Sequence, residues 1–132
     1  MLSSIALNMI DKKRCELEKL CLDIWNNPER GFKEVKACEW IADMLRQNGF
    51  DVNVGIAGVP TAIKASFGSG YPVIGFLGEY DAMPGLSQKV KPQRDPVRPD
   101  GYGHACGHNL LGVAHLGAVI GIKEAMEKGN IK

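Results

Sequence analysis

Two stretches near the N-terminus carry apolar residues at helical spacing. In residues 3–26 the apolar positions fall at i, i+3, i+4 and i+7 and the other face is charged, which predicts an amphipathic helix ending before Pro28. Its stripe comprises Leu17, Leu20, Cys21 and Ile24. The same spacing predicts a second helix over residues 33–47. The stripe of this helix comprises Cys38, Ile41, Ala42 and Leu45.

The middle of the chain changes to patterns that are typical of strands. Residues 51–56 and 61–67 alternate between apolar and polar positions, which predicts two half-buried strands. Residues 72–78 form a continuous apolar run, Pro-Val-Ile-Gly-Phe-Leu-Gly. Such a run is typical of a strand that is buried on both faces of a sheet. We therefore predict a third strand over residues 72–78.

The last third of the chain combines a long loop with an apolar helix. Residues 82–103 contain four prolines with charged and amide residues between them, which predicts a loop. Structureless loops of about 20 residues usually serve as lids or mobile segments. Residues 107–128 predict a helix that is apolar nearly all round at first and rich in glycine and alanine. These small residues would let the helix pack closely against a sheet.

The order of the predicted elements is helix, helix, three strands, loop and helix, which indicates an α/β fold. A strand buried on both faces and a helix that is apolar all round need neighbours on every side, and 132 residues barely supply them. We therefore expect residues 1–132 to form the N-terminal part of a mixed sheet with flanking helices. The sheet would be completed by sequence outside this chain.

Composition and charge narrow the class of protein. Apolar residues make up 45% of the chain and charged residues 23%, as in an ordinary globular protein. The formal net charge is +1 and the charges are interspersed, so we expect no nucleic-acid or membrane partner. The N-terminus lacks the pattern of a secretory signal, and no apolar run is long enough to span a membrane. We therefore expect a cytoplasmic protein with reduced cysteines.

Cys106 and His108 are the first candidates for chemistry. A thiolate and an imidazole are both good zinc ligands, and Gly107 between them permits an unusual turn. The segment also opens the last helix, whose N-terminus favours the thiolate form of Cys106. We therefore predict half of a metal site here, preceded by His104. On the residues alone, a buried thiol beside two histidines in a turn remains an equal alternative.

Two carboxylates form a second candidate group. Glu79 and Asp81 follow the apolar run at i, i+2, so both side chains can point the same way. Sites in open α/β sheets gather beyond the carboxyl ends of strands, where a carboxylate can bind a metal or orient a histidine ligand. The alternative is a pair of solvated turn acids. His115 is interpreted as a core or half-exposed histidine, and Trp25 as a packing residue.

Three segments together resemble a known family. They are Asn-Pro-Glu-Arg-Gly-Phe (27–32), Gly-Glu-Tyr-Asp-Ala-Met-Pro (78–84) and Gly-His-Ala-Cys-Gly-His-Asn (103–109). In this order they resemble the zinc-dependent amidohydrolase and metallopeptidase family of the aminoacylase and carboxypeptidase type. The sequence Cys-Gly-His-Asn-Leu is more similar to the aminobenzoyl-glutamate hydrolase branch than to the hippurate hydrolase branch. The other branch usually has Asp and a second His in place of Asn109 and Leu111.

The resemblance implies specific roles and a cofactor. It implies an α/β catalytic domain with a two-metal centre, of which this chain would be an incomplete part, and a separate inserted dimerisation domain that is absent here. Cys106 and His108 would be metal ligands, and Asp81 would support the metal site as a catalytic residue. The metal would be a divalent cation, zinc or manganese. The role of Glu79 stays open, because other branches place a histidine ligand there.

The resemblance also implies an activity for a longer parent protein. Family members hydrolyse amide bonds in N-acyl amino acids and small peptides, such as aminobenzoyl-glutamate or dipeptides, and the parent would be a homodimer. The catalytic Glu-Glu pair of the family occurs nowhere in these 132 residues. We therefore expect this chain alone to be inactive. The alternative from another class is a non-catalytic α/β interaction module or remnant.

Overall fold

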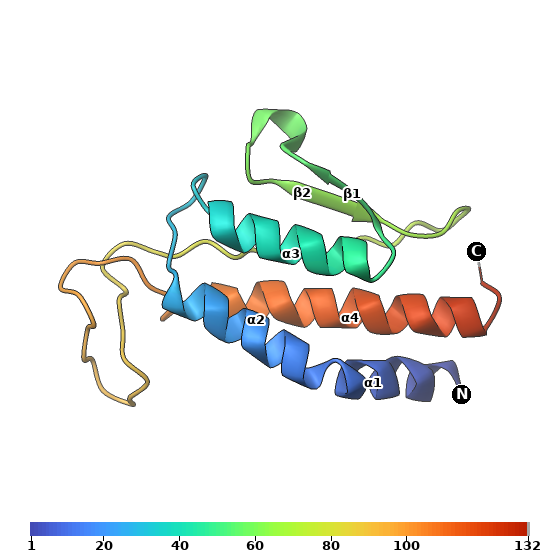
Figure 1. Cartoon of the computed structure of the whole chain (residues 1–132), viewed down its shortest axis with the longest axis horizontal. Coiled ribbons are helices and arrows are strands. Elements are labelled where there is room, and N and C mark those ends of the chain that lie inside the picture. Colours follow the sequence, from blue (N-terminus) through green and yellow to red (C-terminus); the bar gives the residue numbers. More distant parts are fainter. Residues whose placement is uncertain (132) are drawn as a thin grey trace.

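The computed structural model describes residues 1–131. Helices and a small two-stranded sheet lie side by side in it, which confirms the predicted α/β class (Figure 1). The elements are α1 (Leu2–Lys12), α2 (Arg14–Asn26), α3 (Val35–Gln47), β1 (Asp51–Val54), the 3-10 turn η1 (Ile56–Gly58), β2 (Ile63–Ser66) and α4 (His108–Lys128).

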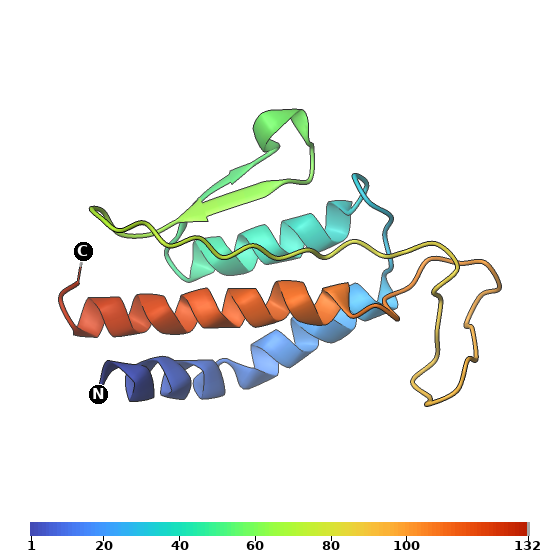
Figure 2. The ribbon, with the colours of Figure 1, turned by 180° about the vertical axis from the view of Figure 1, so that it is seen from behind.

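Helix α4 occupies the middle of the molecule. It lies between the α1–α2 pair on one side and α3 on the other, and the β1–β2 hairpin covers the far side of α3 (Figures 1 and 2). The core between the helices is formed by apolar residues from α2, α3 and α4. Its buried members are Leu17, Leu20, Ile24, Ala37, Ile41, Leu45, Val113, Leu116 and Ile120. Most residues of the stripes predicted on α2 and α3 belong to this core, and the half-buried Cys21 packs against it. Cys38 and Ala42 of the α3 stripe are also buried but are not members of this core.

The predicted helix over residues 3–26 is two helices that meet at Lys13. Lys13 lies outside regular helical geometry, with φ −88° and ψ 1°. The bend allows α1 to follow the C-terminal half of α4, where a Cβ on Gly121 would lie 2.8 Å from the carbonyl oxygen of Ala6. The missing side chain at Gly121 therefore permits a close approach of α1 to α4. Within residues 1–131, no helix combines the length and the apolar character needed to cross a membrane.

The sheet is smaller than predicted. Strands β1 and β2 pair antiparallel, with Asp51 opposite Ser66 and Val54 opposite Ile63. The predicted third strand over residues 72–78 is wrong for the described chain, because this segment is extended but pairs with no strand. Its apolar side chains are largely exposed, 80% for Val73 and 92% for Leu77. The physical reason is that a strand needs a neighbour to hydrogen bond with, and the described residues offer none at this position.

The predicted loop over residues 82–103 contains no helix and no regular strand. Its two ends are joined by a pair of hydrogen bonds between Met83 and Gly103, with N–O distances of 3.0 and 3.1 Å. Inside the loop, Lys89 and Lys91 both form ion pairs with Asp95. Because the Met83–Gly103 hydrogen bonds hold the two ends of the loop together, the start of α4 lies beside residues 79–82.

Candidate metal centre

Residues 79–82 form one wall of the candidate site. The amide of Ala82 donates a 2.7 Å hydrogen bond to the carbonyl oxygen of Glu29, which joins this segment to the connection between α2 and α3. Tyr80 turns away from the site, and its hydroxyl donates to the carbonyl oxygen of Thr61. Because side chains alternate along an extended chain, Glu79 and Asp81 project to the opposite side from Tyr80. Burial raises the pKa of Tyr80 well above its usual value.

Two glutamates fix the connection that supports this wall. The Glu29 carboxylate accepts hydrogen bonds from the amides of Lys36 and Ala37, at 3.2 and 3.1 Å, and so satisfies free amides in the first turn of α3. The buried Glu34 carboxylate accepts from the amide of Phe32, at 2.9 Å, and from the hydroxyl of Thr61, at 2.7 Å. The Asn-Pro-Glu-Arg-Gly-Phe segment therefore has a structural role, which is to place residues 79–82.

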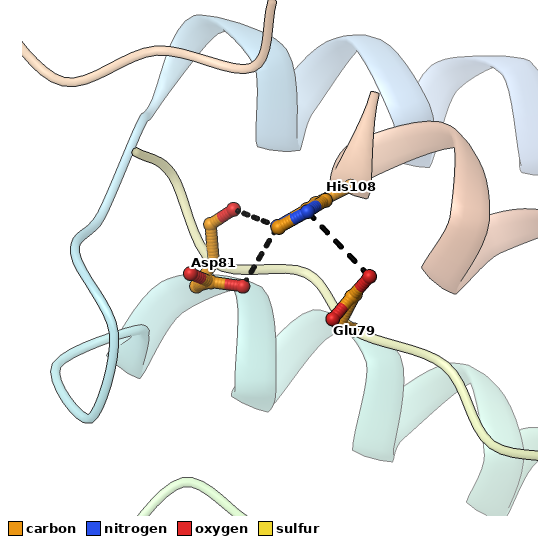
Figure 3. A group of neighbouring side chains, drawn as sticks. All are labelled: Glu79, Asp81 and His108. Carbon is orange, nitrogen blue, oxygen red and sulfur yellow. Dashed lines mark hydrogen bonds and ion pairs between the residues drawn. The ribbon is translucent and has the colours of Figure 1, made fainter. Parts of the chain in front are cut away.

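His108 provides the other half of the site. It is the first residue of α4, and the preceding Gly107 has a φ of 93°, a left-handed conformation that favours glycine. Its Nδ1 lies 2.8 Å from Oδ1 of Asp81 and 3.1 Å from the carbonyl oxygen of Asp81. Its Nε2 lies 3.5 Å from Oε1 of Glu79. Figure 3 shows the imidazole between the two acidic residues.

This geometry assigns a different part to each ring nitrogen of His108. Both groups next to Nδ1 are acceptors, so the tautomer with hydrogen on Nδ1 satisfies both, and in it the Nδ1–H donates a hydrogen bond to Asp81. Nε2 is then free to act as a ligand, and the carboxylate of Glu79 is beside it. A histidine that binds a metal through one ring nitrogen commonly donates the N–H of its other ring nitrogen to a carboxylate. The donor set therefore fits a divalent metal ion, and Asp81 is hydrogen bonded to the imidazole that would bind it.

The described residues contain one group of at least three potential metal ligands, and it consists of Glu79, Asp81 and His108. One donor atom from each lies within 4.8 Å of the others. Glu79, whose role was open from sequence, thus belongs to the group. The i, i+2 spacing had already placed Glu79 in a candidate pair with Asp81, and the structure adds His108 to that pair. The group is open to solvent on the Glu79 side, since the side chain of Glu79 is 58% exposed and that of His108 only 12%.

Cys106 does not join this group in the described residues. Its thiol is exposed, two residues before His108 and beside a surface hollow of about 640 Å³. The hollow is also lined by Trp25, Leu110 and His104. Trp25 thus contributes to a surface beside the candidate site, a position that no pattern in the sequence indicates. The paired role of Cys106 and His108 as ligands stays a prediction.

The remaining histidines differ from His108. His115 lies further along α4, outside the group, and its Nδ1 is 2.8 Å from the carbonyl oxygen of Leu111. It is half-buried, in agreement with its interpretation from sequence. His104 is only 3% exposed, and burial lowers its pKa, as does the neighbouring His108, while Asp81 acts in the opposite direction. His104 is therefore buried close to the group, in the wall of the hollow beside Cys106.

Comparison with known proteins identifies relatives of the chain, although no family model matches it. It is 42% identical over 120 residues to a subunit of the p-aminobenzoyl-glutamate hydrolase from Escherichia coli (strain K12), covering 90% of this chain and 25% of the relative. It is 28% identical over 137 residues to Xaa-Arg dipeptidase of Mus musculus, and the match covers 96% of this chain and 28% of the relative. It is 31% identical over 96 residues to hippurate hydrolase of Campylobacter jejuni, and the match covers 71% of this chain and 24% of the relative.

The chain belongs to the amidohydrolase and peptidase family that its three motifs predicted. Within that family, its 42% identity to the p-aminobenzoyl-glutamate hydrolase exceeds its 31% identity to hippurate hydrolase, which agrees with the branch that the Cys-Gly-His-Asn-Leu segment indicated. The chain spans about a quarter of the length of these relatives.

Proposed function

We propose that the longer protein to which this chain corresponds hydrolyses an amide bond in N-acyl amino acids or dipeptides, in a metal-dependent reaction. The observation that carries this proposal is the contact of His108 with Asp81 and Glu79, because it joins two of the family motifs into one set of metal donors. The names of the relatives support the substrate class, since they describe an aminobenzoyl-glutamate hydrolase, a dipeptidase and a hippurate hydrolase.

Each residue of the group has a defined part in this proposal. His108 Nε2 and the Glu79 carboxylate would hold the cation, zinc or manganese, and Cys106 would join them as a ligand. Asp81 would keep the Nδ1 proton of His108 in place and so keep Nε2 directed at the ion. A divalent cation, when bound, polarises the scissile carbonyl and lowers the pKa of water. The chain itself therefore supplies ligands and their orientation.

The general base is the part that these residues do not supply. No two glutamates are adjacent in the sequence, whereas the resemblance implies such a pair in the complete active site. We therefore propose that residues 1–132 are the N-terminal portion of a catalytic domain and are inactive alone. A cytoplasmic location and a homodimer formed by a separate domain complete this proposal. The rival function is a non-catalytic α/β interaction module.

Zinc binding by the 132-residue chain tests the proposal. Titration of the purified chain with zinc against a chromophoric chelator should show one bound ion. His108→Ala should weaken binding at least tenfold, whereas His115→Ala, which removes a histidine from the same helix outside the group, should leave binding unchanged. Equal loss in both variants, or no binding by the unmodified chain, would favour the non-catalytic module. Hydrolysis of N-acyl amino acids by the chain alone would contradict its proposed inactivity.

A further inference from the structure

Two polar side chains near the candidate metal centre have buried atoms without hydrogen-bond partners. Among residues 1–131, these atoms are both ring nitrogens of His104 and the side-chain oxygen Oδ1 of Asn109. Each residue is only 3% exposed. Buried polar groups in proteins are nearly always paired, so each exception calls for an explanation, and a functional role is one of the established ones.

The two side chains are chemically complementary. A neutral imidazole always has one N–H that can donate, and the oxygen of an amide can only accept. Asn109 is already oriented by its amide nitrogen, which donates to the carbonyl oxygen of Cys21 at 3.3 Å and contacts the sulfur of Cys21 at 3.2 Å. Its oxygen is thereby left as the free acceptor. His104 therefore has an N–H donor without an acceptor, and Asn109 has an oxygen acceptor without a donor.

Both side chains also face the same side of α2. Asn109 contacts Cys21, and the backbone of Ile24 lies close enough to His104 to raise its pKa by hydrogen bonding, although neither ring nitrogen is aligned with it well enough to count as paired. Cys21 and Ile24 are three positions apart on α2, which places them on neighbouring turns of one helix face. His104 and Asn109 thus approach one stretch of α2 from the two ends of the turn that leads into α4.

The position of the pair in the sequence connects it to the candidate metal centre. His104 and Asn109 enclose the turn that contains Cys106 and His108, the two predicted ligands. This turn already has a 2.8 Å hydrogen bond from the amide of Gly107 to the carbonyl oxygen of His104. A hydrogen bond between His104 and Asn109 at the two ends of this turn would fix the position of Cys106 and His108 between them. If this hydrogen bond forms only when a cation is bound, it stabilises the cation-bound chain and not the cation-free chain.

We propose that His104 and Asn109 are positioning residues: in the cation-bound state the imidazole N–H of His104 donates to Oδ1 of Asn109 and clamps the turn that presents Cys106 and His108. The clamp deepens the proposed function and rests on the metal site described above. Neither residue contacts the ion.

A double-mutant cycle on zinc affinity tests this clamp. His104→Phe and Asn109→Leu, which keep approximate size and remove the polar atoms, should each weaken zinc binding about tenfold. The double variant should bind no more weakly than the Asn109→Leu variant, because both substitutions remove the same clamp hydrogen bond and only Asn109→Leu also removes the bond to Cys21. The midpoint of urea unfolding of the cation-free chain should not fall for His104→Phe. A residue that served only the fold would behave in the opposite way, with a lower midpoint and unchanged zinc affinity.

The controls separate this clamp from the metal site itself. His115→Phe should bind zinc as the unmodified chain does, and the side-chain amide signals of Asn109 should shift when zinc is added in heteronuclear NMR. Zinc affinities that are unchanged in both single variants, or whose losses multiply in the double variant, would overturn the clamp and leave the metal site standing. If His104→Phe does not fold, Asn109→Leu decides alone, and unchanged affinity there overturns the clamp. If the unmodified chain binds no zinc, the metal site fails first and the clamp fails with it.

Discussion

His108 and Asp81 lie 27 positions apart in the sequence, yet Nδ1 of His108 is 2.8 Å from Oδ1 of Asp81. Two supports bring them together. The Met83–Gly103 hydrogen bonds close the long loop between the two residues, and the bond from Ala82 to Glu29 fixes the segment that carries Asp81. The contact is thus produced by backbone pairing on either side of it, so each side chain can be changed without removing the supports.

Asp81→Asn should weaken zinc binding by the chain about tenfold to a hundredfold, the usual effect of removing a carboxylate that orients a histidine ligand. The neutral amide no longer favours the Nδ1 proton of His108. Isothermal titration calorimetry measures the change. Asp43→Asn is a suitable control, because Asp43 is exposed on α3 and pairs with Arg46. Unchanged zinc affinity in Asp81→Asn would refute the orienting role.

Cys106→Ser should lower zinc affinity if the thiolate is a ligand, since an alcohol binds zinc far more weakly than a thiolate does. Cys15 is also exposed but lies on α2, so Cys15→Ser should bind zinc normally. Cobalt substitution adds a direct readout, because a sulfur ligand gives a charge-transfer band in the near ultraviolet. The absence of this band in the unmodified cobalt-bound chain would exclude Cys106 from the metal's ligands.

Gly121→Ala should destabilise the chain by about 1–3 kcal/mol through overpacking. Alanine favours a helix over glycine by about 1 kcal/mol, but here its Cβ would lie 2.8 Å from the carbonyl oxygen of Ala6. The steric term therefore exceeds the gain in helix propensity. Urea unfolding followed by circular dichroism gives the free energy of unfolding. A variant more stable than the unmodified chain would show that α1 does not pack closely on α4.

Leu77→Lys should reduce self-association of the chain without changing its thermal stability. The side chain of Leu77 is 92% exposed within an extended apolar segment, so its removal forfeits little packing. A charge on an exposed strand-like segment opposes pairing between chains. Light scattering on concentrated samples measures the effect. Ile24→Lys is the contrasting change, since Ile24 is fully buried and this substitution should unfold the chain.

Cys38 should react with iodoacetamide more slowly than Cys15 at pH 8. Burial raises the pKa of the Cys38 thiol, so a smaller fraction is in the reactive thiolate form at this pH. The rate at Cys38 should keep rising as the pH increases above the ordinary range of thiol titration. Peptide mass spectrometry distinguishes the two sites. Equal rates in the folded chain would contradict the burial of Cys38, and equal rates in urea serve as the control.

The site was only partly accessible from sequence. The spacing of Glu79 and Asp81 and the proximity of Cys106 to His108 indicated two separate donor pairs. Their combination into the group Glu79, Asp81 and His108 depends on the closed base of the loop, which leaves no local sequence pattern. Likewise, nothing in the periodicity revealed that His104 is buried without a partner, because burial depends on α2 packing over the turn.

Local periodicity and short motifs were enough to predict the helices, the two short strands and the family, because none of these depends on distant neighbours. The tertiary structure decided what depends on distant neighbours. It separated α1 from α2 at Lys13, where the chain bends to follow α4. It also left residues 72–78 extended and unpaired, because an apolar run has the propensity for a strand, but a strand forms only where another backbone provides hydrogen-bond partners.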